Sequence, residues 1–152
     1  MNRHQTRRGL AVGLALAVAA GLGACSPITT QIQYAASDGV RVAVSDTVTV
    51  QNLMIIAAAE GAPGAVQGGV VNDGSEPAAV AIGDVTVEVA AGETVLLGGS
   101  AGDEVVIEQT TAAPGANAQL SVGLDGAPGE TVYVPVLDGT LPEYADLVPA
   151  TS

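Results

Sequence analysis

Short apolar runs separated by glycine- or proline-bearing turns recur along residues 39–137, and they constrain the fold more than any other feature. In runs such as "VRVAV" and "TVTVQNLMII", apolar residues alternate with polar ones or follow one another, as in half-buried and fully buried β-strands. No segment of ten or more residues after residue 39 has a helical period. The sequence therefore predicts an all-β fold, an antiparallel β-sandwich of the Ig-like or cupredoxin-like kind with about eight or nine strands.

Turn-forming residues divide these runs at short intervals. Asn72, Asp73 and Gly74 tolerate a positive φ and predict a tight turn, and Gly83-Asp84 predicts another. Pro135 lies inside the last run and predicts an edge position or a bulge, because proline has no N–H to donate. The expected strands are 40–44, 47–56, 66–72, two within 78–89, 94–99, 103–110, 118–124 and 131–136.

The composition suits strands and gives the chain a strongly acidic surface. Valine is abundant while Phe and Trp are absent, and β-branched side chains fit a pleated, half-buried surface. The formal net charge is −12, and after residue 36 the only basic residue is Arg41. Such a chain repels phosphate backbones and anionic headgroups, so no nucleic-acid partner is expected.

The first 24 residues follow a different pattern. Arg3, Arg7 and Arg8 precede an uncharged run at residues 9–24 that ends in small residues. This is the layout of a secretory signal peptide, and the run is short for a bilayer span, which needs ~20 residues. The Arg7-Arg8 pair in "TRRGL" loosely resembles a twin-arginine export signal, so two export routes stay open.

The signal peptide ends at Leu22, Gly23, Ala24 and Cys25, and these four residues resemble a lipobox, the recognition sequence of bacterial lipoprotein processing. The resemblance implies a diacylglycerol on the Cys25 thiol, cleavage before Cys25, and a lipid-anchored place on the extracytoplasmic face of the cell membrane. Two acyl chains bury enough CH₂ groups for a stable hold. The alternative is an ordinary signal peptide with an incidental cysteine. No other cofactor is expected.

These features divide the chain into four parts. Residues 1–24 are the predicted lipoprotein signal peptide, and residues 25–38 are the lipidated cysteine and a tether. Residues 39–137 are the predicted sandwich domain, and residues 138–152 are a C-terminal tail.

Several framework motifs between residues 40 and 137 resemble the periplasmic copper-chaperone family PCuAC. They are "VTVQNLMI", "GGVVNDGSEPAAV", "VEVAAGETVLLGG" and "GLDGAPGETVYVPV", in which Ala90, Ala91 and Gly92 take the place of one family turn and Gly98-Gly99 of another. The resemblance implies a cupredoxin-like sandwich. Together with the lipobox and the tail "LPEYADLVP", the chain resembles actinobacterial surface lipoproteins of the LpqE type.

The copper ligands of that family are missing from this chain. His4 lies in the predicted signal peptide, and the only later methionine, Met54, lies in an apolar run where it is expected to fill the core. Cu(I) prefers sulfur and imidazole ligands, so no metal site is expected. Acidic residues near turns could offer oxygen to Ca²⁺, but no twelve-residue loop pattern joins them. They are Asp73, Asp84, Asp103, Glu104 and Asp125.

The residue types needed for hydrolysis are also missing. After Cys25 there is no His and no Lys, which excludes Ser/His/Asp, Cys/His and Ser/Lys arrangements. Paired carboxylates of the glycosidase kind need aromatic sugar platforms, and only Tyr34, Tyr133 and Tyr144 are available. No catalytic residue and no enzymatic activity are therefore predicted.

The sequence thus predicts a membrane-anchored extracytoplasmic lipoprotein that binds an unidentified protein or envelope partner, or serves as a structural component of the cell envelope. Its membrane partner is lipid, reached through acylated Cys25. One alternative is a metal-handling accessory protein derived from a copper-chaperone fold. The other is an enzyme of unknown type.

Overall fold

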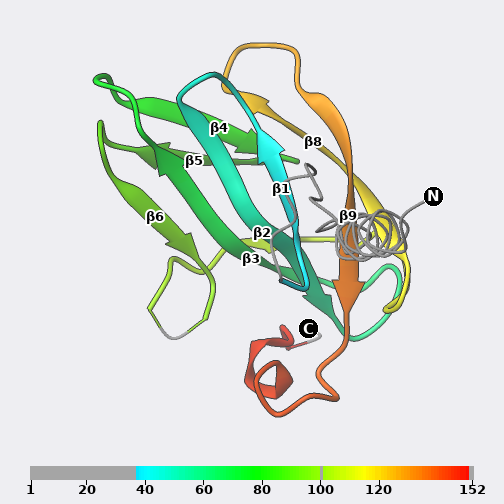
Figure 1. Cartoon of the computed structure of the whole chain (residues 1–152). Helices are drawn as coiled ribbons and strands as arrows, with labels where there is room; N and C mark the ends of the chain where they lie inside the picture. Colours follow the sequence, from blue (N-terminus) through cyan, green and yellow to red (C-terminus); the bar gives the residue numbers. More distant parts are fainter. Residues whose placement is uncertain (1–36, 100, 151–152) are drawn as a thin grey trace, which may run out of the picture. The chain divides into compact units, whose positions relative to one another are not determined.

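β-Strands form the framework of residues 37–99 and 101–150, the part of the chain that the computed structural model describes (Figure 1). The prediction of an all-β sandwich is confirmed, and the helical structure within these residues is one short 3₁₀ helix, η1 (Ala145–Leu147). The strands are β1 (Val40–Ala43), β2 (Val48–Ala57), β3 (Gly64–Asn72), β4 (Ala78–Ile82), β5 (Val85–Val89), β6 (Thr94–Leu97), β7 (Val106–Ile107), β8 (Asn117–Leu124) and β9 (Glu130–Leu137).

Two layers of strands face each other and are joined through β9. The strand order is β5-β4-β8-β9-β2-β3-β6, with β1 paired to β2 and β7 paired to β3. All pairs are antiparallel except β2 with β9, which run parallel at Ile55–Val136 and Ile56–Leu137. Figure 1 shows β1, β2, β3 and β6 in front of β4, β5 and β8. The antiparallel prediction therefore holds for every other described pair, and this one parallel pair closes the sandwich into a barrel-like shape.

A bulge in β2 lets two strands share one edge. β1 pairs with β2 up to Leu53, and β9 pairs with it from Ile55 onward. The break lies at Asn52, which has a φ of 52° and accepts a 2.8 Å hydrogen bond from the Gly39 N–H through its side-chain oxygen. Asparagine tolerates this left-handed conformation better than most residues. The β1 pairing resumes after the bulge only at Leu53, where β1 begins, and the edge from Ile55 onward pairs with β9.

The expected strand over residues 103–110 is wrong in length, because only Val106 and Ile107 form β7. The preceding residues turn back onto the end of β6 instead. Gly98 N–H donates a 2.7 Å hydrogen bond to Asp103 O, and Asp103 N–H donates a 2.9 Å bond to Leu96 O. This turn uses the backbone groups that a longer β7 would need.

Pro135 lies where β9 changes partners. The Val136 N–H donates to Ala116 O on the β8 side at 2.9 Å, so the neighbouring Pro135 nitrogen faces the opposite edge. Pairing with β2 begins only at Val136. The expected edge position is therefore wrong, because β9 lies between β8 and β2. The proline is tolerated because its nitrogen, which has no N–H to donate, faces away from β8 at the point where the β2 pairing begins.

Aliphatic side chains fill the space between the layers without aromatic rings. The inner cluster combines residues from both layers, including the fully buried Leu53, Ile55, Val66, Val80 and Val134. Each buried aliphatic side chain contributes about 1.5–3 kcal/mol. Shape-complementary valines and isoleucines thus replace the aromatic residues that the sequence lacks.

Candidate functional site

The predicted lipidation site lies outside the described residues. Leu22, Gly23, Ala24 and Cys25 precede residue 37, so their prediction rests on the sequence. Within residues 37–99 and 101–150, no helix has the length and hydrophobicity that crossing a bilayer requires.

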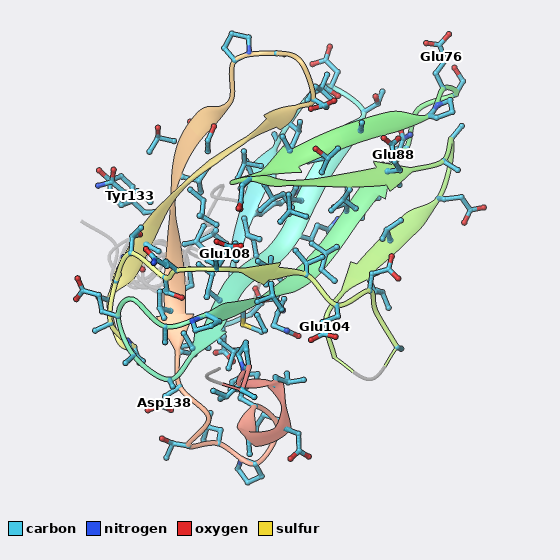
Figure 2. The ribbon with its side chains drawn as sticks, turned by 180° about the vertical axis from the view of Figure 1, so that it is seen from behind. Glu76, Glu88, Glu104, Glu108, Tyr133 and Asp138 are labelled. Atoms are coloured by element: carbon cyan, nitrogen blue, oxygen red, sulfur yellow. The ribbon has the colours of Figure 1, made fainter. Side chains whose placement is uncertain are left out.

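The acidic residues are spread over the surface and form no enclosed pair. All sixteen Asp and Glu side chains lie in the described residues, and every one of them is exposed. Figure 2 shows Glu76 at the tip of the β3–β4 turn and Asp138 at the other end of the domain. Among the described residues, no three His, Cys, Asp or Glu side chains gather closely enough to hold a metal ion.

Two ionisable groups depart from their ordinary behaviour, and both lie near the C-terminal segment. The Thr140 side chain and backbone N–H hydrogen-bond Asp138, with the backbone bond at 2.9 Å, and they lower the pKa of that carboxyl. The hydrogen bond that the Tyr144 hydroxyl donates to Asp38 raises the pKa of the phenol to about 12. Both shifts lead away from neutral pH, where a general acid or base is most effective.

The loops at the Glu76 end are held together by one buried side chain, Asn72. Its amide nitrogen donates to the backbone oxygens of Glu76 at 2.7 Å, Ala90 at 3.2 Å and Val89 at 3.4 Å. Its oxygen accepts from the Gly74 N–H at 2.9 Å. This amide satisfies its hydrogen-bonding groups internally, as a buried polar group must. Asn72 therefore fixes the β3–β4 turn against the β5–β6 loop.

A small apolar patch is buried on the outer face of β2 and β3, opposite the inner cluster. Met54 pairs with Gln67 and Ile56 pairs with Ala65, and none of the four belongs to the inner cluster although each is buried. We call these four residues the outer patch. Met54 is buried, as its apolar run predicts, but it lies on the outer face of the sheet and not in the inner cluster.

A cavity of about 350 Å³ opens over the outer patch, and we call it the outer cavity. Its wall comes from three parts of the chain, namely β3, the connection from β6 to β7, and the C-terminal segment. Figure 2 shows Glu104 on that connection, on the side of the domain where the C-terminal segment lies. The lining residues are Ala65, Gln67, Gly98, Gly99, Glu104, Val105 and 146–150.

Gln67 is the one buried polar side chain on this wall. It is 6% exposed, and the part of the chain that the structure describes offers its amide no hydrogen-bond partner. No local pattern in the sequence links Gln67, Glu104 and Asp146 to one site. The available signal was a lone amide among the apolar and glycine residues of "AVQGGVV". The residues that cover it are about eighty positions later in the chain.

Comparison with known proteins identifies no family: no protein-family model matches the chain, and no curated protein matches it.

Proposed function

We propose that this protein is a lipid-anchored, extracytoplasmic lipoprotein whose β-sandwich binds a partner or serves the cell envelope structurally, without catalysis. The observation that carries the proposal is the run Leu22-Gly23-Ala24-Cys25 directly after an uncharged segment and an arginine-rich start. A thiol at this position is the nucleophile that lipoprotein processing uses. The resemblance to PCuAC and to LpqE-type surface lipoproteins supports the same envelope location.

The place where the tether joins the domain supports a display role. The chain reaches β1 through Asp38, which is hydrogen-bonded to Tyr144 of the C-terminal segment. The β3–β4 turn with Glu76 lies at the other end of the domain (Figure 2). The loops 45–47, 72–77 and residue 124 meet there around a common surface. An anchor at the Asp38 end would leave this distal loop end, as we call it, free to meet a partner.

The rigidity of the distal loop end also favours binding. Asn72 fixes the 72–77 loop against the neighbouring β5–β6 loop by hydrogen bonds to the Glu76 and Ala90 oxygens. The Asp73 N–H donates to Thr47 O of the β1–β2 turn at 2.8 Å. Loops that are ordered before binding lose less conformational entropy when a partner docks. This arrangement is typical of a surface prepared for recognition.

The charge of the domain favours an acyl anchor over direct adsorption to the membrane. Arg41 is the single basic residue between residue 37 and residue 150, against sixteen acidic ones. An anionic lipid surface repels such a domain within a Debye length of ~8 Å. The acyl chains would therefore hold the protein while the sandwich stays off the headgroups.

The anchor is tested by Cys25→Ser in the native host, with Ser26→Ala as the matched control. The wild-type protein and Ser26→Ala should be recovered with detergent from the membrane fraction. Their intact mass should exceed that of residues 25–152 by two or three acyl chains. Cys25→Ser should lack acyl chains and keep its leader. Recovery of wild-type protein in water with a free thiol would refute the anchor.

The binding role is tested separately by photocrosslinking on intact cells. A photoreactive amino acid at Glu76, on the distal loop end, should capture a discrete partner. The same amino acid at Asp138, at the tether end, serves as the matched control and should not capture that partner. Equal capture from both positions, or no capture from Glu76, would contradict partner binding by the distal loop end and would favour the structural role.

A further inference from the structure

We propose that the outer cavity binds a small organic cation, a ligand with an alkylammonium group. Gln67, Glu104 and Asp146 would recognise the ammonium, and the apolar part of the wall would hold the alkyl chain. The inference supplies a ligand for the proposed binding role, but it does not depend on the lipid anchor.

The first argument is the hydrogen bonding of Gln67, which contrasts with that of Asn72. Both side chains are buried amides, with exposed fractions of 6% and 1%. Asn72 makes four hydrogen bonds to the backbone, whereas within the described residues Gln67 makes none. A buried amide has two donors and one acceptor oxygen, and native structures rarely leave them all unused. An ammonium in the cavity would supply the hydrogen-bond donor that the Gln67 amide oxygen lacks.

The amide of Gln67 is accessible from the cavity and is not sealed in the protein. Among the described residues, Thr110 Oγ1 is the side-chain atom that has no hydrogen-bond partner and is also fully shielded from solvent. The amide atoms of Gln67 are not fully shielded in this way. Gly98, on the same wall, has a φ of 68°, and a Cβ there would lie 2.2 Å from the Gln67 Nε2. Because glycine has no Cβ, the Gln67 amide can occupy this space at the cavity wall.

The charge of the cavity selects a cation. Glu104 comes from the β6–β7 connection and Asp146 from η1, so exposed acidic residues line the cavity from two parts of the chain. The wall carries no basic residue, because Arg41 is the only one in the described ranges and lies elsewhere. A cleft with charges of one sign concentrates ligands of the other sign.

The donor set favours an ammonium group over a metal ion. Ca²⁺ takes six to eight oxygen ligands, and the described residues contain no group of three acidic side chains that could begin such a shell. An ammonium carries three N–H donors, which one amide oxygen and two carboxylates can accept. The Val105, Leu147 and Val148 side chains line the remaining wall and suit an alkyl chain. The volume of about 350 Å³ lies within the range of small-molecule sites.

The test uses the full chain in a non-ionic detergent, with 1,5-diaminopentane as the probe and 1,5-pentanediol as its uncharged control. In ¹H–¹⁵N NMR spectra, the diamine should shift the Gln67 side-chain NH₂ and the Gly98 and Gly99 amide signals. The shifts should saturate below about 10 mM, because a dissociation constant near 1 mM is the weak end of specific binding. The diol should leave these signals unchanged. Shifts that do not saturate, or that spread over all acidic residues, would overturn the proposal.

Matched variants separate the site from the general negative charge. Glu104→Gln should weaken diamine binding about threefold to tenfold, the usual effect of losing one charged hydrogen bond. Glu88→Gln makes the same charge change on β5, away from the outer cavity (Figure 2), and should leave binding unchanged. Equal weakening by both variants would show that only the overall charge attracts the probe.

Gln67→Leu tests the amide itself and should weaken binding at least tenfold. The change keeps the size of the side chain and removes unpartnered polar atoms, so the melting temperature should not fall. If this variant did not fold, the wild-type spectra and the Glu104→Gln comparison would still decide the matter. Failure of the diamine to bind would leave the acylation of Cys25 untouched, so the two proposals fail separately.

Discussion

The Tyr144 hydroxyl donates a 2.5 Å hydrogen bond to Asp38 Oδ2, joining residues that are 106 positions apart in the sequence. Asp38 lies two residues before the start of β1, and Tyr144 directly precedes η1 in the C-terminal segment. The bond therefore fastens the two ends of the described chain to each other. It also stabilises the protonated phenol, whose pKa is raised from 10.0 to about 12.

This bond predicts a loss of stability in alkaline solution. The folded-state pKa of Tyr144 is higher than its unfolded value, so the phenol contributes stability that is complete below pH 10. The contribution disappears as the pH rises from 10 to about 12, where the phenolate forms beside the Asp38 carboxylate. Denaturant unfolding at a series of pH values should show this decline, and Tyr144→Phe should flatten it. Tyr133→Phe is the control, because the Tyr133 side chain is 60% exposed and hydrogen-bonds to no carboxylate among the described residues. An equal flattening by the control would contradict the assignment.

Asn72→Ala is expected to destabilise the domain by about 2–3 kcal/mol, because it leaves buried backbone groups of two loops without partners. Asn72→Asp should cost more at neutral pH, since a carboxylate would face the Glu76, Val89 and Ala90 oxygens that the amide now serves. Its extra cost should shrink as the pH falls toward about 4, because the buried carboxyl is protonated above its ordinary pKa, and it should be absent below that pH. Urea unfolding measures both costs, and Asp73→Asn, at the exposed next residue, is the control. Equal stability of the two Asn72 variants at pH 7 would refute this role.

Thr110→Val is expected to leave the free energy of unfolding unchanged or to raise it by up to about 1 kcal/mol. The Thr110 side chain is 1% exposed, and its hydroxyl has no hydrogen-bond partner among the described residues. Valine keeps the shape and removes the unpaired hydroxyl. Thr110→Ser, which keeps the hydroxyl and loses the methyl group, should instead cost about 1 kcal/mol. The reverse order of the two variants in thermal unfolding would show that the hydroxyl has a partner.

Titration with Cu(I) or with Ca²⁺ is expected to leave the melting temperature of the protein unchanged. A metal that binds only the folded state raises the melting temperature. The described residues offer no cluster of three metal-ligating side chains, and His4 lies in the predicted signal peptide. Differential scanning calorimetry with a chelator control measures the effect. A rise with either ion would favour the metal-handling alternative over the display role.

The strands could be predicted from the sequence because their signals are local. Alternating valines and the turns at Asn72-Asp73-Gly74 and Gly83-Asp84 indicate where strands begin and end, and the structure confirms them. The length of β7 could not be predicted in this way. Residues 103–110 have strand composition, but Asp103 is held by hydrogen bonds to β6, which depend on how distant parts of the chain meet.

The outer cavity could not be predicted from local sequence patterns for the same reason. Gln67 stands in a strand that the sequence does predict, yet its burial depends on residues 146–150 and on the turn at Gly98. The continuous apolar run of Leu53 to Ala57 did carry a relevant signal. A strand that is apolar on successive positions is covered on both faces, which is how the outer patch forms.

The parallel pairing of β9 with β2 has a consequence for the order of events in the cell. Because β9 supplies the only described pairing between the two layers, the barrel-like closure needs Val136 and Leu137 to find Ile55 and Ile56, about eighty residues upstream. Contacts so far apart in sequence form late and slowly. Under the export that we propose, a nascent chain that is still crossing the membrane would therefore complete its barrel-like closure only after β9 has emerged on the far side.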